Sequence, residues 1–458
     1  MEKEKNNRSS FSGKIGFVLS AAGASVGLGN IWRFPYLAAK YGGGIFLLIY
    51  ILLALTFGYT MIVAESALGR MTRKSPVGAF KAFGKKAGWL SFGGWINAII
   101  PVLIVPYYSV IGGWVIKYFV EYLKGNGAKL AEDGYFSKFI SNGLSTEICF
   151  IVFCMFTLII IYAGVRNGIE RVSKFMMPIL VVLSVIIAIY SVTRPGALAG
   201  VKYFLVPNPK NFSWMTVVTA MGQMFYSLSI AMGILVTFGS YMKKDTSIED
   251  STRNVEVFDT AIAIMAGLMI IPAVFAFSGG DPDTLQAGPS LMFITIPKVF
   301  DSMGFGTFAG ILFFLLVLFA AVTSSIVLTE SAVSTVEDEL KWSRKKSTVI
   351  VGCIMIILGT LSCLGYGPLS FVKIIGMQFL DFFDFLTNSV MMPIAALMTS
   401  LFVSKVVGVD RMEEEIRHGE SKFRRKKIFV VMIKYLCPIF AIIILVSSVA
   451  NAFGWISM

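Results

Sequence analysis

The sequence predicts an all-α membrane protein with eleven transmembrane helices. Of its 458 residues, 56% are apolar and only 15% are charged, whereas soluble domains carry about 25% charged residues. Lysines and arginines concentrate in short polar segments between long apolar ones. Eleven apolar segments approach the roughly 20 residues that a spanning helix needs. They lie near residues 14–38, 44–69, 91–122, 147–165, 171–192, 213–241, 257–278, 306–335, 348–364, 376–404 and 428–456.

The basic residues of the short loops predict the orientation. They cluster in 3–8, 70–86, 166–171, 243–244, 341–346 and 411–427. With eleven spans all these loops share one side, which the positive-inside rule makes cytoplasmic. The same pattern accounts for the net charge of +13 without a nucleic-acid partner. We therefore expect a protein of the inner (plasma) membrane that contacts the lipid bilayer, with a cytoplasmic N-terminus and an external C-terminus.

The cysteines and the histidine do not indicate catalysis. His418 lies in a charged loop, and no nucleophile–base pair or metal cluster occurs in any span. All five cysteines fall in apolar spans without ligand spacing, so we expect core residues and not a disulfide framework or a metal site. They are Cys149, Cys154, Cys353, Cys363 and Cys437. An enzyme and an organic cofactor are therefore not expected.

The run Gly23–Pro35 is anomalous for a membrane helix. It holds three glycines within seven residues, which weakens a helix. Asn30 and Arg33 place an amide and a cation where lipid would reject both. Broken backbone at membrane depth is tolerated only where it is buried in protein or lines a watery cavity. Freed carbonyls can bind a cation and freed N–H groups a carboxylate, so the run predicts a binding site.

A second interruption lies in the sixth span, at Ser227–Gly233. Spans one and six would each begin a block of five helices. Paired interruptions at corresponding positions indicate an inverted-repeat transporter with its site between them. Serine and glycine at close spacing also serve ordinary helix packing. The expected parts are a cytoplasmic segment 1–12, a first repeat 13–192, a second repeat 193–404 that includes the extracellular loop before helix six, a cytoplasmic loop 405–427, and 428–458 with helix eleven and a short external end.

Oxygen-bearing side chains at membrane depth fit a hard cation such as sodium. Asn30, Ser227, Ser229 and Thr323–Ser325 are candidates, although a Thr-Ser-Ser run also bonds back to its own helix. Asp259, near the cytoplasmic start of span seven, is either paired or cation-bound, or else a solvated residue at a helix end. Tyr108 could donate to a substrate carboxylate, or be a core aromatic.

Two pairs of charges are positioned to act as gates. Arg33 and Asp384 lie near the outer ends of spans one and ten, and Arg8 could meet Asp338 on the inside. The alternative for each is an ordinary interfacial charge.

Several motifs together resemble the neurotransmitter:sodium symporter family, specifically its bacterial amino-acid transporters. The resemblance covers essentially the whole chain. The most specific segments are Gly23–Pro35 followed by Gly42–Gly44, Gly222–Ser229, Thr323–Ser325 leading to Glu337–Leu340, and the spacing from Gly168 to Pro178. The resemblance implies the leucine-transporter (LeuT) fold, in which two inverted five-helix repeats contain unwound helices one and six. It also implies that Gly168 and Pro178 let helix five unwind and hydrate the second sodium site.

The resemblance further implies two sodium ions, an amino-acid substrate and two gates. The first sodium site would use Ser25, Asn30, Ser227 and Asp259; the second would use Gly23, Val26, Ala320, Thr323 and Ser324. The substrate backbone would meet Ser25, Leu28, Gly29, Tyr108, Phe225, Ser227 and Leu228. The side-chain pocket would be Ile104, Phe225, Tyr226, Met232, Ser325 and Leu328. Arg33 and Asp384 correspond to the outer gate, closed by Tyr108 and Tyr226; Arg8, Asp338 and Tyr241 correspond to the inner gate.

These implications predict a sodium-coupled symporter for hydrophobic, possibly aromatic, L-amino acids that works by alternating access. Counted from Ser240–Tyr241, Asp259 falls where many members have a sodium-binding asparagine. Its carboxylate adds the negative charge that chloride supplies elsewhere in the family, so we expect chloride independence. An amino-acid sensor would use the same site without net flux. A channel does not explain paired interrupted helices.

Overall fold

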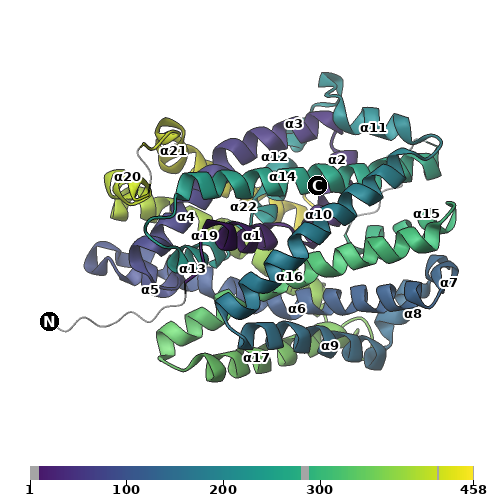
Figure 1. The fold of residues 1–458 in the computed structure, drawn as a ribbon, viewed down its shortest axis with the longest axis horizontal. Coiled ribbons are helices and arrows are strands. Elements are labelled where there is room, and N and C mark those ends of the chain that lie inside the picture. The colour runs from purple at the N-terminus through teal and green to yellow at the C-terminus, as the bar shows by residue number, and fades with distance from the viewer. Residues whose placement is uncertain (1–9, 280–287, 420–421, 457–458) are drawn as a thin grey trace.

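The computed structural model describes residues 10–279, 288–419 and 422–456, and in these residues regular structure is helical (Figure 1). Pairing of extended backbone is limited there to two isolated bridges, Gly43 with Pro207 and Ile374 with Met377. Long helices run side by side along the longest axis, and short helices gather at its two ends. The predicted all-α class is therefore confirmed.

Among the described residues, nine helical stretches are long and apolar enough to cross a membrane. They are Gly44–Thr72 (α3, Gly44–Leu53, and α4, Tyr59–Thr72), Gly88–Leu123 (with α6, Phe92–Leu123), α9 (Gly143–Tyr162), Val165–Val192 (with α10, Arg171–Val192), α14 (Ile248–Ser278), α16 (Gly306–Leu340), α17 (Arg344–Leu364), Phe379–Val407 (α18, Phe379–Asp384, and α19, Met392–Leu401) and Lys426–Ala452 (α21, Lys426–Val431, and α22, Cys437–Ala452). A tenth is the pair Lys14–Ser25 (α1) and Gly29–Lys40 (ending in α2, Phe34–Lys40), bent by 54°.

The remaining predicted span, 213–241, is divided into two short helices. These are α12 (Trp214–Ser227), which starts at a capping box formed by Ser213 and Thr216, and α13 (Ile234–Tyr241). Neither half alone reaches the length that a bilayer requires. Both interruptions that the glycines and serines predicted in spans one and six are therefore present.

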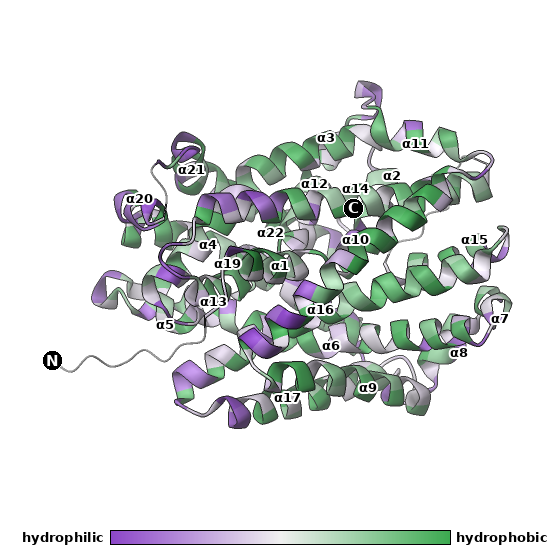
Figure 2. Cartoon of the chain, viewed as in Figure 1, coloured by the Kyte–Doolittle hydropathy of each residue, from purple (hydrophilic) through white to green (hydrophobic). Residues whose placement is uncertain are grey.

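Hydropathy follows the long axis of the molecule (Figure 2). The middle is predominantly apolar, and hydrophilic residues gather toward the two ends. One end carries α5 (Pro76–Lys81), α20 (Val409–Arg417) and α21; the other carries α7 (Gly127–Ala131), α8 (Tyr135–Ser141), α11 (Ala197–Leu205) and α15 (Ile296–Asp301). The basic loops before α6 and α21 thus share one end, as the predicted orientation requires.

Helix α14 starts earlier than its apolar pattern predicts, at Ile248 instead of near 257. Its first turn is polar and has its own start signal. Ser247 caps it by accepting from the backbone N–H of Asp250, and Glu249 and Asp250 place negative charge at the helix N-terminus, where the dipole favours it. Hydropathy alone cannot locate such an end, because the first turns lie outside the apolar stretch.

The broken helix α1 lies in the interior of the bundle. It packs against α10, α14 and α16, and its residues from Ser20 onward are buried. This arrangement places the non-helical backbone at 26–27 within protein, where the freed polar groups can find partners.

Candidate functional site

A small cavity of about 30 Å³ lies where the two broken helices meet. Its lining comes from α1 and the break that follows it, from α6, from the α12–α13 break and from α16. The residues are Ala24, Ser25, Gly27, Leu28, Gly29, Asn30, Ile104, Tyr108, Tyr226, Ser227, Ser229, Met232, Ser324 and Leu328. Most of the residues predicted to contact substrate are therefore brought together, although they come from segments up to about 300 residues apart in sequence.

One wall of this cavity adjoins a buried cluster of oxygens centred on Asp259. The Asn30 amide donates to Asp259 Oδ1 at 2.9 Å and to Ser227 Oγ at 2.8 Å. Ser227 Oγ donates to the same Oδ1 at 2.8 Å. Asp259 is fully buried and lies inside α14, so the alternative of a solvated helix end is wrong. Asn30, Ser227 and Asp259 thus come together as the first sodium site requires.

Tyr50 also belongs to this cluster, and the sequence reasoning missed it. Its hydroxyl donates to Asp259 Oδ2 at 2.7 Å, and its side chain is fully buried. A tyrosine in an apolar span carries no signal of such a contact, because its ring suits any core position. The contact follows only from the packing of α3 against its neighbours.

A second oxygen cluster lies between α1 and α16. Ser324 Oγ donates to the carbonyls of Gly23 and Val26 at 3.1 and 3.2 Å. Thr323 Oγ1 is within 3.1 Å of the Ala320 carbonyl. A Cβ added at Gly23 would lie 3.3 Å from the Thr323 side chain, so the two helices approach closely at this point. Ser324 thus joins α1 to α16 as the second sodium site requires, whereas Thr323 makes the bond back to its own helix that was the alternative, to the Phe319 carbonyl at 2.9 Å.

These hydroxyl–carbonyl contacts form a donor set suited to a hard cation. Carbonyl and hydroxyl oxygens are the ligands such ions prefer. The Ser324 hydroxyl already bridges two carbonyls that the helix break has released. If the Ser324 hydroxyl rotates so that its proton points away from the two carbonyls, its oxygen can bind the same cation as the carbonyls do.

Glycines in the break are required by close contacts. A Cβ at Gly27 would lie 2.7 Å from Ser324 Oγ, and one at Gly29 would lie 2.4 Å from the Tyr226 ring. The neighbouring N–H of Leu28 donates to Tyr108 Oη at 3.3 Å. The backbone N–H groups and the phenol are thus close enough to share one anionic group.

Three residues predicted to contact substrate do not line the small cavity. Phe225 stacks on Phe57 with ring centroids 5.9 Å apart, Ser325 Oγ lies 3.2 Å from Thr157 Oγ1, and Leu228 is buried in the core. Conversely, Ser229 lines the cavity and donates to the Ala24 carbonyl at 2.9 Å. The sequence indicates Ser229 as a candidate cation ligand and gives no sign that it lines the cavity.

Above the small cavity lies a larger one of about 400 Å³, lined in part by Arg33, Tyr108, Tyr226 and Asp384. Tyr108 and Tyr226 line both cavities and so form the boundary between them. Arg33 stacks over the Tyr226 ring at 5.4 Å. Within the described residues no direct ion pair joins Arg33 to Asp384, whose Oδ1 accepts from Asn388 at 2.6 Å. The two gate residues therefore face one cavity without closing it.

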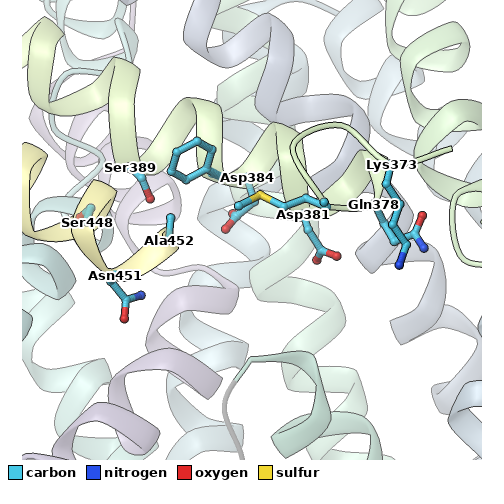
Figure 3. A pocket seen from close by; sticks show the side chains of 11 residues that line it. Lys373, Gln378, Asp381, Asp384, Ser389, Ser448, Asn451 and Ala452 are labelled. Carbon is cyan, nitrogen blue, oxygen red and sulfur yellow. The ribbon is translucent and has the colours of Figure 1, made fainter. Parts of the chain in front are cut away.

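The larger cavity of about 400 Å³ is called the vestibule below. A neighbouring pocket of about 450 Å³ shares part of its lining (Figure 3). Asp384 lines both the vestibule and this pocket. In the picture the carboxylates of Asp381 and Asp384 lie between Asn451 of α22 on one side and Lys373 on the other. The outer approach to the site is therefore polar.

The opposite end of α1 is closed by contacts that the sequence reasoning did not predict. Phe11 packs against Phe17, Phe238 and Tyr241, and its N–H donates to the Tyr241 carbonyl at 3.3 Å. Ser12 donates to Glu170 from its N–H at 2.9 Å and from its hydroxyl. We call these contacts of Phe11 and Ser12 with Tyr241 and Glu170 the latch. A phenylalanine and a glutamate next to basic loops carry no specific sequence signal of such contacts.

The predicted inner gate is described only in part. Arg8 lies outside the described residues. Asp338 accepts from the N–H of Ser75 at 2.6 Å. The Tyr241 hydroxyl donates to Glu330 at 2.6 Å. The two described members thus lie in polar networks at the end of the molecule that carries the basic loops.

The segment before α10 departs from regular α-helix, and the unwinding expected of the Gly168–Pro178 motif stays a prediction. Residues Val165–Glu170 form a π-helical turn, and Pro178 lies inside α10. A Cβ at Gly168 would lie 2.1 Å from the Ile160 carbonyl, so no other residue fits there. The irregular backbone therefore covers Val165–Glu170, which includes Gly168, whereas α10 is regular helix from Arg171 through Pro178.

Comparisons with known proteins agree with this geometry. Residues 8–130 and 137–454 match the model of the sodium:neurotransmitter symporter family. An uncharacterized sodium-dependent transporter, YhdH of Bacillus subtilis (strain 168), is 35% identical over 96% of this chain and 97% of its own length. The crystal structure of MhsT in complex with L-phenylalanine superposes with a TM-score of 0.85 and 34% identity over 96% of this chain and all of that one. A sodium- and chloride-dependent glycine transporter 2 from Xenopus laevis is 26% identical over 90% of this chain and 61% of its own length.

The matches span nearly the full chain, and the structural match extends to the LeuT fold with its unwound first and sixth helices. The relatives are transporters and not enzymes. The chain belongs to the sodium:neurotransmitter symporter family and is a multi-pass, sodium-dependent membrane symporter.

Proposed function

We propose that this symporter imports hydrophobic L-amino acids, aromatic ones included, together with two sodium ions. The observation that carries the proposal is the small cavity flanked by two clusters of buried oxygens. One cluster holds Asn30, Ser227 and Asp259, and the other holds Ser324 with the carbonyls of Gly23 and Val26. Alternating access then follows from opening the vestibule and the latch in turn.

In this proposal, the backbone of the amino acid binds at the broken helices. Its carboxylate lies near the N–H groups of Leu28 and Gly29 and the Tyr108 hydroxyl, and it completes the first sodium site. Its ammonium meets carbonyls near Ser25 and Ser227, with the Ser229 hydroxyl close by. Since the carboxylate is then a ligand of sodium, each raises the affinity of the other by the same factor.

The side chain of the substrate would occupy the apolar part of the cavity, which has to expand on binding because about 30 Å³ holds only a few water molecules. Ile104, Met232 and Leu328 line it, and no charged side chain belongs to the lining in the described part of the chain. A charged substrate side chain would be left unpaired, which is costly. Met232 is unbranched and adapts to different shapes. That MhsT was crystallised with L-phenylalanine supports a substrate of this class.

Chloride independence is part of the proposal. Asp259 brings a carboxylate into the first sodium site, and a carboxylate buried beside a cation needs no further anion. The sodium gradient is then supplemented by the membrane potential, which contributes about 2.3 kcal/mol per charge per 100 mV.

The proposed setting is the plasma membrane, with the basic loops on the cytoplasmic side. The proposed organisation is the one expected from the sequence: repeats over 13–192 and 193–404, followed by a cytoplasmic loop and helix eleven. The hydrophilic end that carries α5, α20 and α21 supports this orientation.

Uptake into proteoliposomes tests the function. Purified protein is reconstituted, an inward sodium gradient is imposed, and uptake of labelled phenylalanine and leucine is competed with every common amino acid. We expect sodium-dependent accumulation that hydrophobic amino acids inhibit and charged ones do not. Binding without accumulation would instead identify an amino-acid sensor, and inhibition only by small or charged amino acids would overturn the proposed substrate class.

A further inference from the structure

The short segment between α5 and α6 exposes large aromatic side chains. Residues Gly84–Lys86 and Gly88–Ser91 form two short 3₁₀ helices, and the second leads directly into α6. Trp89 in this segment is 72% exposed, and Phe92 at the start of α6 is 59% exposed. Tryptophan is highly buried on average, so rings as open as these indicate a partner outside the chain.

Exposed and buried side chains follow each other in this segment with a period of three. The exposed positions carry Lys86, Trp89 and Phe92, and the residue after each of them is buried. Residues three apart share a face of a 3₁₀ helix, so one face turns toward the protein and another away from it. Along the outward face a cation is followed by an amphipathic ring and then by an apolar ring.

Aromatic packing holds the segment in place from the inside. The Phe83 ring lies edge-on against Phe402 with centroids 5.5 Å apart, and Phe80 of α5 stacks on the same ring at 4.2 Å. On the outside, a Cβ added at Gly84 or Gly88 would meet nothing within 4 Å. The segment is therefore fixed on one side and uncovered on the other.

The uncovered side carries two lysines that lack an acidic neighbour. Lys85 and Lys86 are exposed, and neither forms an ion pair within the part of the chain that the structure describes. Lys81, one turn earlier, differs because it pairs with Glu339 at 2.7 Å. Two unpaired cations thus lie beside two open rings. We call these four residues the interface patch: Lys85, Lys86, Trp89 and Phe92.

The interface patch lies where the chain enters the membrane. It joins α5, at a hydrophilic end of the molecule, to the apolar span Gly88–Leu123 (Figure 1, Figure 2). In the proposed orientation this end is cytoplasmic. Tryptophan is enriched at membrane–water boundaries because its ring is amphipathic, and the anionic lipids of the cytoplasmic leaflet attract lysine. A second copy of this chain on the same patch would instead bring like charges together.

We propose that the interface patch binds an anionic phospholipid of the cytoplasmic leaflet. The ammonium groups of Lys85 and Lys86 contact the phosphate, the Trp89 indole lies at the level of the headgroup, and the Phe92 ring contacts the upper acyl chains. Phe92 begins α6, which also lines the small cavity, so the bound lipid holds this helix at its depth in the membrane. The proposal requires the membrane orientation but no particular substrate.

Quenching of tryptophan fluorescence in the full-length protein tests this contact. The protein is kept in detergent micelles, and phosphatidylglycerol brominated near the top of its acyl chains is titrated in, with brominated phosphatidylcholine as the comparison without net charge. The chain has seven tryptophans, so the Trp89 signal is the difference between each protein and the same protein carrying Trp89→Phe. We expect phosphatidylglycerol to quench this signal at a lower concentration than phosphatidylcholine does.

Neutral variants of the two lysines test the recognition of the phosphate. In Lys85→Gln combined with Lys86→Gln, the half-quenching concentration of phosphatidylglycerol is expected to rise about 25-fold, because each lysine contributes about fivefold at an anionic surface. Lys85→Arg combined with Lys86→Arg keeps both charges and should match the wild type. Lys129→Gln combined with Lys138→Gln is the matched control, since it removes two exposed lysines of α7 and α8 at the other end.

Four results would overturn the proposal. A Trp89 signal that neither lipid quenches would show that the patch does not contact lipid, and association of the protein in the same micelles would then identify a second copy as the occupant. Equal quenching by the two lipids would show that the charge is not recognised. An unchanged half-quenching concentration in the Lys85 and Lys86 glutamine variant, or an equal rise in the control, would show that these lysines are not the site.

The outcome is independent of the proposed function, because no amino acid or sodium gradient enters the measurement. Absence of amino-acid uptake would leave the lipid site standing. Absence of lipid recognition at the interface patch would leave the transport proposal standing.

Discussion

The two candidate sodium sites are built from different chemistry. The first contains a full negative charge, the fully buried Asp259, which accepts hydrogen bonds from Asn30, Ser227 and Tyr50. The second contains only neutral oxygens, from Thr323, Ser324 and backbone carbonyls. One site therefore has a fixed charge to neutralise, and the other depends on the broken backbone of α1.

This difference indicates a division of roles. A buried carboxylate is unfavourable without a cation, so under the proposed function we expect the first site to favour sodium strongly and to link it to the substrate carboxylate. The second site joins α1 to α16 through carbonyls that are available only while α1 is broken and in place. We therefore expect an ion bound at the second site to stabilise α1 in this position. Substitutions that remove a ligand group from one site at a time test these two roles separately.

The largest effect is expected from Asp259→Asn. Loss of one partner of a buried charged pair costs about 3 kcal/mol, which corresponds to more than about a hundredfold in the sodium concentration for half-maximal uptake. Proteoliposome uptake in chloride-free buffer measures it. Asp245→Asn, at an exposed position before α14, is the matched control and should match the wild type. Added chloride should partly restore Asp259→Asn; unaltered sodium dependence in this variant would contradict the role of the carboxylate.

A smaller effect is expected from Ser324→Ala in the neutral site. The variant removes one hydroxyl, worth about 1 kcal/mol, and should weaken sodium dependence roughly fivefold. The measurement is the same sodium titration, with Ser184→Ala as control because, among the described residues, the Ser184 hydroxyl bonds only to the Val181 carbonyl of its own helix. A loss as large as that of Asp259→Asn would mean that the two sites do not differ in the way proposed.

Tyr50→Phe sharpens the comparison within the first site. It removes a single donor to Asp259 while the ring keeps its packing, so a roughly threefold weaker sodium dependence is expected. Tyr118→Phe, which loses a comparable bond to the Phe293 carbonyl far from the site, is the control. Equal effects of the two variants would show a loss of stability and not a role in sodium binding.

The smallest effect is expected when chloride is replaced by gluconate for the wild type. With Asp259 supplying the negative charge, uptake should change by less than about twofold, or under half a kcal/mol. Initial rates at saturating sodium measure it. Strong stimulation by chloride would show that the carboxylate does not take the place of the anion.

Much of the site could be predicted because charged and amide side chains are rare at membrane depth and because closely spaced glycines weaken a helix. Asn30, Asp259 and the Gly23–Gly29 run stand out against an apolar background, and the motif resemblance assigned them to sites that the structure assembles. Tyr50 and Glu170 could not be predicted in the same way. Their side chains suit many positions, and each acquires its role from a partner that is remote in sequence.

The sequence by itself determined the helical class, the two interruptions and the gathering of basic loops at one end of the molecule, because a bilayer restricts backbone and charge segment by segment. Only the tertiary structure decided how the oxygens of the two candidate sodium sites come together. It also decided the contacts of Phe11 and Ser12 with Tyr241 and Glu170. These features depend on distances between different helices, and side-chain contacts of that kind leave no periodic pattern in the chain.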